Sequence, residues 1–198
     1  MKTVGGPCDA ARVKTQYYTA TSIDGFIADP DNSLDWLLRF GDGSGDTYSA
    51  FIAKVGAIAM GSTTYRWILD HHIYPDADHP RPWDYTQPTW VFSTQELPVL
   101  PGADIRFVRG DVARVHAEMT EAAAGRNIWV VGGGELAGQF HDHGLLDELI
   151  LGYTPVALGG GAPLLPRRIS EPPMELVDVR RDGPFALLTY AVGSAGRS

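Results

Sequence analysis

The sequence predicts an α/β fold: a mainly parallel central sheet, helices on both of its faces, and an antiparallel C-terminal hairpin at one edge. Runs of apolar and β-branched residues alternate along the chain with segments of helical spacing. Two of these runs, 57–60 and 127–131, are continuously apolar, as expected of strands buried on both faces of a parallel sheet. The last two runs, 175–180 and 185–192, are separated by an Asp-Gly turn and predict the edge hairpin.

The first half of the chain alternates between strand, helix and loop signals. Residues 15–21 are aromatic and β-branched, which favours a strand, and residues 29–45 favour a loop apart from the apolar island 34–38. A short helix is predicted from Asp46 because apolar side chains follow at helical spacing. The remaining elements of this half are a strand at 57–60 that stops at Gly61, a helix capped by Ser62, Thr63 or Thr64 that runs to Leu69, and a long loop over 70–87.

The second half continues the same alternation and ends in strands. Asp111 is placed to cap a helix, because an apolar stripe begins directly after it. In order, the predicted elements are strands at 89–92 and 105–108, a helix at 111–124, a strand at 127–131, a helix at 135–143, a strand at 146–154, a loop at 159–166 and the two hairpin strands.

Length and composition predict one domain in a chain of 198 residues. We expect a flexible extension at 1–14, the domain at 15–192 and a flexible tail at 193–198. The net charge of −8 argues against nucleic-acid or anionic-membrane partners. No apolar run approaches the roughly 20 residues needed to span a bilayer, and the single cysteine, Cys8, cannot form an internal disulfide. A cytoplasmic location is therefore expected.

The strand-to-helix turn at Gly132-Gly133-Gly134 is the sharpest local feature of the sequence. Backbone N–H groups and the positive end of the following helix would converge there, and glycine would let a pyrophosphate approach the backbone. A tight turn without a ligand explains the same residues equally well. A Rossmann fingerprint extending to Gly138 does not, because 152–158 lacks the acidic residue expected about 20 positions further on.

Four motifs, the glycine turn among them, occur in the order seen in the dihydrofolate reductase-like superfamily. They are Ser22-Ile23-Asp24-Gly25-Phe26-Ile27-Ala28, Met60-Gly61-Ser62-Thr63-Thr64-Tyr65, Val91-Phe92-Ser93-Thr94-Gln95 and Val131-Gly132-Gly133-Gly134-Glu135-Leu136. From about Thr15 to Val192 the chain resembles this superfamily. The segments 145–149 and 158–161 resemble its riboflavin-biosynthesis branch, the C-terminal reductase domain of the deaminase-reductase. The resemblance implies a three-layer fold and a cis Gly-Gly peptide in the glycine turn.

The resemblance also implies an oxidoreductase that uses NADPH, with NADH as the alternative, and transfers hydride to a small C=N or C=O substrate of pterin or pyrimidine type. Such a protein would be similar to dihydrofolate reductase or to 5-amino-6-(5-phosphoribosylamino)uracil reductase. It would form a homodimer, for which the apolar C-terminal strands are a candidate interface. The catalytic acid would be Asp46, and substrate contacts would come from Asp24, Trp36 and Tyr153. Cofactor contacts would come from Ala20, Ile27, Ala28, Gly61, Ser62, Thr63, Thr64, Ser93, Thr94, Arg109, Val131, Gly132, Gly133, Gly134, Glu135 and Leu136.

Several positions depart from the family pattern. Ser62 replaces the arginine that usually pairs with the 2′-phosphate of NADPH; Arg109 would either supply that charge or be an ordinary solvated arginine. Gln87 and Gly152 stand where folate enzymes carry an arginine and a threonine, which argues against folate turnover. Phe26 stands where the riboflavin branch carries Lys or Arg, so the substrate stays open.

Two other classes of function are kept beside the reductase. The poorly matched substrate anchors allow a nucleotide-binding module of the same fold without turnover. The histidine-rich loop over 71–79 allows a metal-dependent hydrolase, but its spacing matches no helix-borne ligand pattern, so no metal site is predicted. Asp46 also has a second interpretation, as an exposed cap of its helix.

Overall fold

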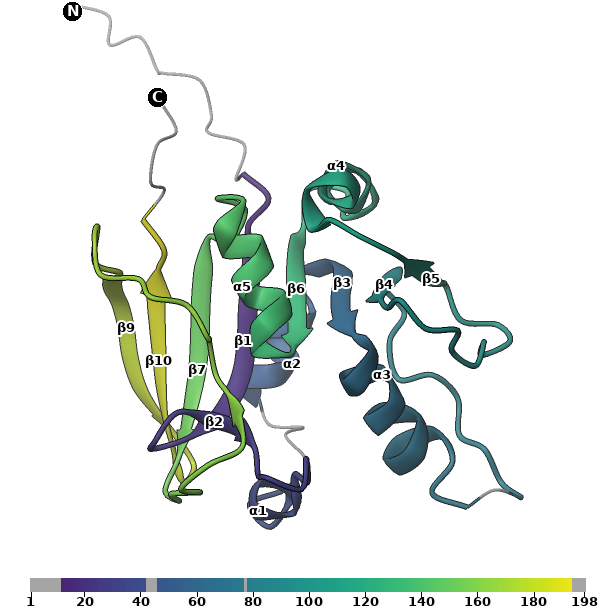
Figure 1. Cartoon of the computed structure of the whole chain (residues 1–198), viewed down its shortest axis with the longest axis horizontal. Helices are drawn as coiled ribbons and strands as arrows, with labels where there is room; N and C mark the ends of the chain where they lie inside the picture. Colours follow the sequence, from purple (N-terminus) through teal and green to yellow (C-terminus); the bar gives the residue numbers. More distant parts are fainter. Residues whose placement is uncertain (1–11, 42–45, 77, 194–198) are drawn as a thin grey trace, which may run out of the picture.

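The fold is built on an eight-stranded sheet (Figure 1). The computed structural model describes residues 12–41, 46–76 and 78–193. The strand order is β5-β4-β3-β6-β1-β7-β10-β9. β1 (Thr15–Ser22) lies inside the sheet and pairs in parallel with β6 (Asn127–Gly132) on one side and with β7 (Glu148–Thr154) on the other.

The sheet stays parallel towards one edge and becomes antiparallel towards the other. Beyond β6, the parallel pairing continues through β3 (Val55–Gly61), β4 (Thr89–Phe92) and β5 (Ile105–Val108). Beyond β7, the antiparallel hairpin consists of β10 (Phe185–Ala191) and β9 (Glu175–Asp182). The mainly parallel sheet with an antiparallel C-terminal edge, as predicted from the sequence, is therefore confirmed.

Helices cover both faces of the sheet, as predicted. They are α1 (Asp35–Leu38), α2 (Asp46–Ile52), α3 (Ser62–Ile68), α4 (Val112–Ala122) and α5 (Gly134–Asp142). On one face α4 and α5 bury Met119 and Phe140 in a common core with the strands. On the other face α2 and α3 pack around Ile58 and Trp129. Figure 1 shows α5 in front of β1 and α2 behind the sheet.

α3 does not end where the sequence predicts. The chain continues as a π-helical turn, η1 (Leu69–Ile73), whose first and last side chains are buried. The prediction of a loop from residue 70 was wrong because the polar residues between these two hide the helical spacing. The predicted hydroxyl cap was also wrong: the N-cap is Gly61, no side chain caps the helix, and Ser62 is its first residue.

A two-stranded sheet joins the motif at 22–28 to the segment 159–166, which was predicted as a loop. β2 (Phe26–Ala28) pairs antiparallel with β8 (Ala162–Pro163). Gly161 allows the close approach: its φ is +127°, and a Cβ atom there would lie 2.0 Å from the carbonyl oxygen of Ala28. The pairing fixes the motif at 22–28 against the segment that follows β7.

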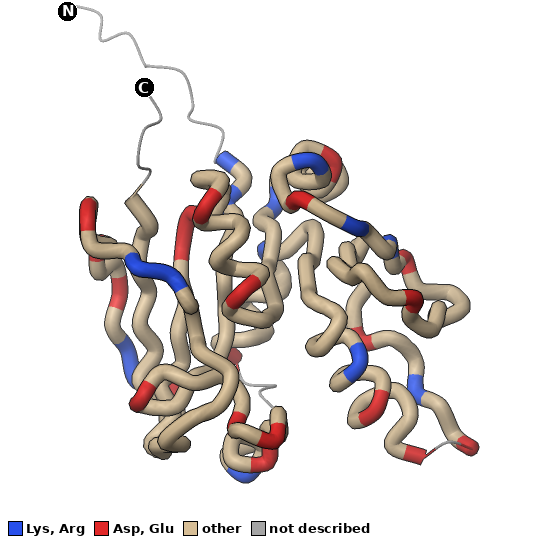
Figure 2. The backbone as a smooth tube through the Cα atoms, in the orientation of Figure 1, with Lys and Arg blue, Asp and Glu red and all other residues tan. Residues whose placement is uncertain are grey.

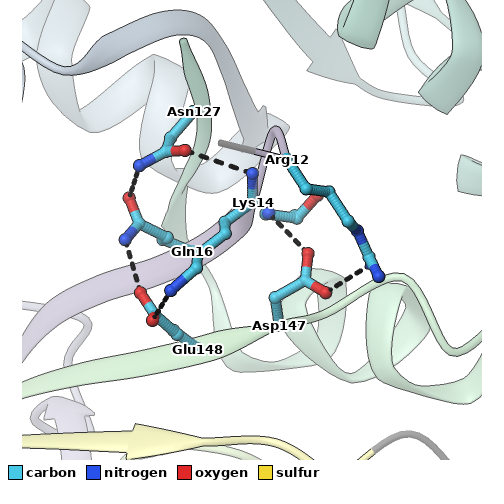
Figure 3. A network of polar contacts seen from close by, with 7 residues as sticks. Arg12, Lys14, Gln16, Asn127, Asp147 and Glu148 are labelled. Atoms are coloured by element: carbon cyan, nitrogen blue, oxygen red, sulfur yellow. Dashed lines mark hydrogen bonds and ion pairs between the residues drawn. The ribbon is translucent and has the colours of Figure 1, made fainter. Parts of the chain in front are cut away.

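A polar network holds the amino ends of the three central strands (Figure 3). The Asp147 carboxylate accepts a hydrogen bond from the Thr15 N–H at 2.8 Å. Gln16 donates to Glu148 at 2.6 Å and accepts from the Asn127 amide at 3.0 Å. These contacts tie β1 to β6 and β7 at one end of the sheet, which leaves the carboxyl ends of the strands to form the site.

Among the residues that the structure describes, Lys and Arg do not gather in one cluster. In Figure 2 the Lys and Arg positions are spread over several elements of the described chain. No helix in the described ranges combines the length and the apolar character that crossing a bilayer requires. Cys8 and most of the predicted extension and tail lie outside the described residues.

Candidate functional site

The carboxyl ends of β3 and β6 meet at one edge of the sheet. The two strands are parallel neighbours, with Met60 paired to Gly132. β3 ends at Gly61 and leads directly into α3, while β6 leads through Gly133 into α5. Because α3 and α5 then pack on opposite faces, a crevice opens between their first turns. Open α/β sheets place their ligands in crevices of this kind.

A cavity of about 760 Å³ occupies this crevice, within the size range of ligand pockets. It brings together three motifs that lie far apart in the sequence. Of the residues that the resemblance assigned to a cofactor, those that line the cavity are Ile27, Ala28, Gly61, Ser62, Thr63, Thr64, Val131, Gly132, Gly133, Gly134, Glu135 and Leu136. The lining also includes Trp67 on α3, His72 on the helical turn after it, and Asp84 and Tyr85 in the segment before β4.

Gly133 keeps part of the cavity open. A Cβ atom on this residue would meet only the Cδ1 atom of Ile27, at 3.8 Å, which is ordinary contact. Its φ of −93° and ψ of −179° are extended backbone that any residue adopts. Neither packing nor backbone conformation therefore requires glycine here. The residue is bare where a ligand would lie against the chain, which fits a group that needs close backbone approach. The peptide between Gly132 and Gly133 is cis.

Gly134 has a different role from Gly133. A Cβ atom on Gly134 would lie 2.4 Å from the carbonyl oxygens of Pro163 and Leu164, so packing excludes any side chain. The first turn of α5 is thus pressed against the segment after β8. Its first intrahelical hydrogen bond runs from the Ala137 N–H to the Gly133 carbonyl, and no side chain caps the helix. The earlier N–H groups of that turn are the kind of donors that bind anions.

Hydroxyl groups face the glycine turn from α3. Ser62, Thr63 and Thr64 all line the cavity. Thr64 is nearest: its Oγ1 atom lies 3.1 Å from the point that a Cβ atom on Gly132 would occupy. The lining formed by described residues includes no Lys or Arg. An anion in this crevice would therefore be held by backbone N–H groups, a helix end and neutral hydroxyls.

Asp24 serves the loop and not the cavity. Its carboxylate accepts hydrogen bonds from the Ser22 hydroxyl at 2.6 Å and from the N–H groups of Leu158 and Gly159 at 3.1 and 2.7 Å. These bonds, that from Ser22 above all, lower the pKa of the Asp24 carboxyl to about 2. The carboxylate fastens the 22–28 turn to the segment after β7, and the expected contact of Asp24 with substrate stays a prediction.

Other residues assigned from the resemblance also lie outside the cavity lining. Asp46 is exposed at the start of α2, next to residues outside the described ranges, which agrees with its second interpretation as a helix-end residue. Trp36 is buried at 5% exposure, and Tyr153 lines a separate apolar cavity of about 340 Å³. The cofactor assignments that also lie outside are Ala20, Ser93, Thr94 and Arg109; Thr19 and Phe92 line the cavity from β1 and β4 instead.

His72 and Asp84 form a polar pair in the lining that sequence reasoning missed. The His72 Nδ1 atom lies 3.3 Å from an Asp84 carboxylate oxygen, and both side chains are nearly half exposed. The indole of Trp67 lies beside the His72 ring, with centroids 5.2 Å apart. Tyr85 is largely buried nearby, and burial raises the pKa of its hydroxyl. The helical spacing of residues 64, 68 and 72 could have placed His72 on the face of α3 that lines the cavity. The helix was predicted to end at Leu69, so this spacing was not followed to residue 72.

The histidine-rich segment gathers no metal-ligand set in the structure. His79 pairs with Asp76 at 2.8 Å on the surface, and His71 binds the carbonyl of Trp67 at 2.9 Å. Within the described ranges, no three His, Cys, Asp or Glu side chains come together as a metal site would require. The hydrolase alternative therefore has no structural observation behind it.

Fold and site together define a dihydrofolate reductase-like α/β protein with a nucleotide-sized crevice. The family model for the RibD C-terminal domain matches residues 64–188, and the chain belongs to this family of NAD(P)H-using reductases. The Bacillus subtilis protein YwjB, itself uncharacterized, is 31% identical over 179 residues, which are 89% of this chain and 97% of that protein.

Solved structures show the same fold at lower sequence identity. A diaminohydroxyphosphoribosylaminopyrimidine deaminase/5-amino-6-(5-phosphoribosylamino)uracil reductase from Thermotoga maritima is 17% identical with a TM-score of 0.62, over 91% of this chain and 56% of that one. Dihydrofolate reductase from Enterococcus faecalis, solved with NADP(H), is 16% identical with a TM-score of 0.59, over 90% of this chain and 95% of that one. The dihydrofolate reductase-like fold expected from the sequence is confirmed.

Proposed function

We propose that the protein is an NAD(P)H-dependent reductase that transfers hydride to a small C=N or C=O substrate of pterin or pyrimidine type. The observation that carries the proposal is the bare Gly133, which keeps the crevice open between the first turns of α3 and α5. Membership in the RibD C-terminal domain family supports the class of reaction. NADPH is the proposed cofactor and NADH the alternative, since Ser62 supplies no charge to a 2′-phosphate.

The chain's contribution is position and electrostatics. The N–H groups at the start of α5, with the hydroxyls of Ser62 and Thr64, would hold the diphosphate of a dinucleotide. Ile27 and Ala28, fixed by the pairing of β2 with β8, would form one wall over the reactive ring. When bound, the cofactor supplies the hydride. The apolar walls would exclude water from the transfer.

The proton needed by the substrate is assigned to His72. This proposal replaces Asp46, which is exposed and outside the cavity lining. With Nδ1 turned towards Asp84, the Nε2 atom of His72 is the ring nitrogen available to a substrate. A protonated imidazole would give its Nε2 proton to the substrate nitrogen or oxygen and regain one from solvent, to which the side chain is open.

The part of the lining around His72 favours an uncharged ring as substrate. Trp67 and Tyr85 provide aromatic surface, and the described lining holds no Lys or Arg to bind a phosphate. Phe26 stands where the riboflavin branch carries a cation. A reductase of the 5-amino-6-(5-phosphoribosylamino)uracil type would here act without that anchor, so phosphate-free pterins and pyrimidines are the first substrates to test.

The test is a titration with NADPH and NADH that follows the fluorescence of the five tryptophans, of which Trp67 lines the cavity. Saturable binding with a Kd below the millimolar range supports the proposal. No binding of either nucleotide up to millimolar concentration contradicts it. NADPH consumption, followed by absorbance, with a panel of pterins and pyrimidines then separates a reductase from the alternative, a nucleotide-binding module without turnover.

The proposed assembly is a homodimer located in the cytoplasm. β9 lies at the sheet edge, and Leu176, Val177 and Val179 on it are 52%, 56% and 59% exposed. Apolar side chains on a free edge strand favour pairing with a second copy. Light scattering of the purified protein tests this part of the proposal: a monomer mass across the micromolar range would contradict it.

A further inference from the structure

Arg167 lies along one face of α5, next to the cavity. Two guanidinium nitrogens donate to the two carboxylate oxygens of Glu135, at 2.8 and 2.9 Å. The Nε–H of the same side chain is shared between the oxygens of Asp142, at 2.8 and 3.0 Å. Gly138 lies between these acids on α5, and a Cβ atom there would come within 2.7 Å of the Arg167 Cζ atom. The helix therefore carries a glycine where the guanidinium crosses it.

Glu135 brings a negative charge to the place proposed for a diphosphate. It belongs to the first turn of α5 and lines the cavity. A free carboxylate at this position would be attracted by the helix end and would repel a phosphate bound to the same N–H groups. Within the described lining, the other carboxylate is Asp84 and there is no Lys or Arg. No Lys or Arg of the described lining can offset the charge of Glu135.

Arg167 is the cation in position to offset the negative charge of Glu135. Its side chain is 20% exposed, against 64% for Glu135, so the guanidinium is the better-packed partner. A planar guanidinium that binds both oxygens of a carboxylate also fixes where that carboxylate lies. The hydrogen bonds from Arg167 lower the pKa of the Glu135 carboxyl, which favours its ionised form.

We infer that Arg167 is a positioning residue of the diphosphate site: it neutralises Glu135 and holds its carboxylate to one side, so that the first turn of α5 can accept an anion. The inference rests on the proposed function. Arg167 acts through Glu135, so its effect on a dinucleotide should vanish when Glu135 carries no charge. A purely structural role of Arg167 would not depend on that charge.

The experiment measures NADPH affinity by tryptophan fluorescence for six forms of the full chain at low and high salt. They are the wild type, Arg167→Gln, Arg167→Lys, Glu135→Gln, the double variant Glu135→Gln/Arg167→Gln, and Asp142→Asn. We expect Arg167→Gln to bind NADPH about tenfold more weakly at low salt, with the loss shrinking as salt screens the exposed carboxylate. Glu135→Gln should bind at least as tightly as the wild type, and the double variant should regain the affinity of Glu135→Gln.

Asp142→Asn is the matched control. It removes the other ion pair of Arg167 at a residue outside the cavity lining, and it should leave NADPH affinity within about twofold of the wild type. Arg167→Lys, which keeps the charge, should recover part of the loss and guards against a misfolded Gln variant. Thermal unfolding of each form verifies the fold.

The outcomes separate this inference from the proposed function. Weak binding by the double variant, equal to that of Arg167→Gln, would mean that Arg167 acts through packing and would overturn the inference alone. Unchanged affinity of Arg167→Gln would also overturn it alone. If the wild type binds neither NADPH nor NADH, every form fails together, and the proposed function falls with the inference.

Discussion

Thr64 and Gly132 approach each other across the gap between α3 and β6: the Thr64 Oγ1 atom lies 3.1 Å from the point that a Cβ on Gly132 would occupy. A side chain on Gly132 would press on Thr64 and narrow the crevice. The closeness follows from the register, since Met60, at the end of β3, is paired with Gly132. Two short sequence motifs thereby become opposite walls of one cavity.

Gly133→Val should weaken NADPH binding by at least about 2 kcal/mol, the scale of forcing extra methyl groups into filled space. The introduced isopropyl group would occupy the cavity beside Ile27 and exclude the cofactor from that space. Backbone strain is not expected to contribute, because valine adopts a φ of −93° without cost. The fluorescence titration measures the effect, and unchanged affinity in a folded variant would count against the site.

Gly134→Ala should lower the free energy of unfolding, whereas Gly133→Ala should not. The added methyl group at 134 would lie 2.4 Å from two backbone carbonyl oxygens, which cannot move aside without shifting the segment after β8. A loss of about 1–3 kcal/mol is typical of such overpacking. Urea unfolding of the two variants measures the difference directly. Equal stability of both would show that α5 does not press on residues 163–164 as described.

His72→Gln should reduce hydride transfer about 100-fold, the usual scale for losing a general acid, and leave NADPH affinity unchanged. His79→Gln is the matched control, since His79 forms a similar pair with Asp76 but lies outside the cavity lining. The measurement compares the steady-state rates of His72→Gln and His79→Gln with the best substrate of the panel. A rate for His72→Gln equal to that of the control would remove His72 from the mechanism.

Asp24→Asn should destabilise the protein at neutral pH but not in strong acid. Hydrogen bonds lower the pKa of this carboxyl from 3.8 to about 2 in the folded chain, so its ionised form contributes stability that is fully present above the unfolded-state value. That contribution is lost as the pH falls from the unfolded-state pKa of 3.8 towards the folded-state pKa of about 2. Below the folded-state pKa, the folded and the unfolded chain both bind the proton. Urea unfolding at neutral pH and at about pH 3 should show the difference between wild type and variant shrinking. A difference independent of pH would contradict the assigned hydrogen bonds.

The sequence was sufficient for the features that depend on local residue type. Continuous apolar runs identified the buried strands, and Asp111 was correctly placed as a cap, since its side chain accepts a hydrogen bond from the Ala113 N–H. The glycine turn was visible because several consecutive residues without side chains between a strand and a helix have few explanations. The order of the motifs then indicated the family before any contact was known.

The missed features depend on contacts between distant residues. The pairs His72–Asp84 and Arg167–Glu135 each join a helical residue to a residue in a distant segment without regular structure, so no local pattern relates the two partners. The pairing of β2 with β8 was equally hard to predict, because two segments of three and two residues become strands only when each supplies the other's hydrogen bonds. The hydrogen bonds of Asp24 were not predictable either, because its two backbone donors, Leu158 and Gly159, lie far along the chain.

The most direct measurement is a crystal structure of the chain with NADPH bound. We expect diphosphate oxygens within hydrogen-bonding distance of the N–H groups at the start of α5, beside Gly133, with the nicotinamide ring between Ile27 and Trp67. A nucleotide bound elsewhere on the surface, or a crevice that stays closed at saturating NADPH, would contradict this expectation.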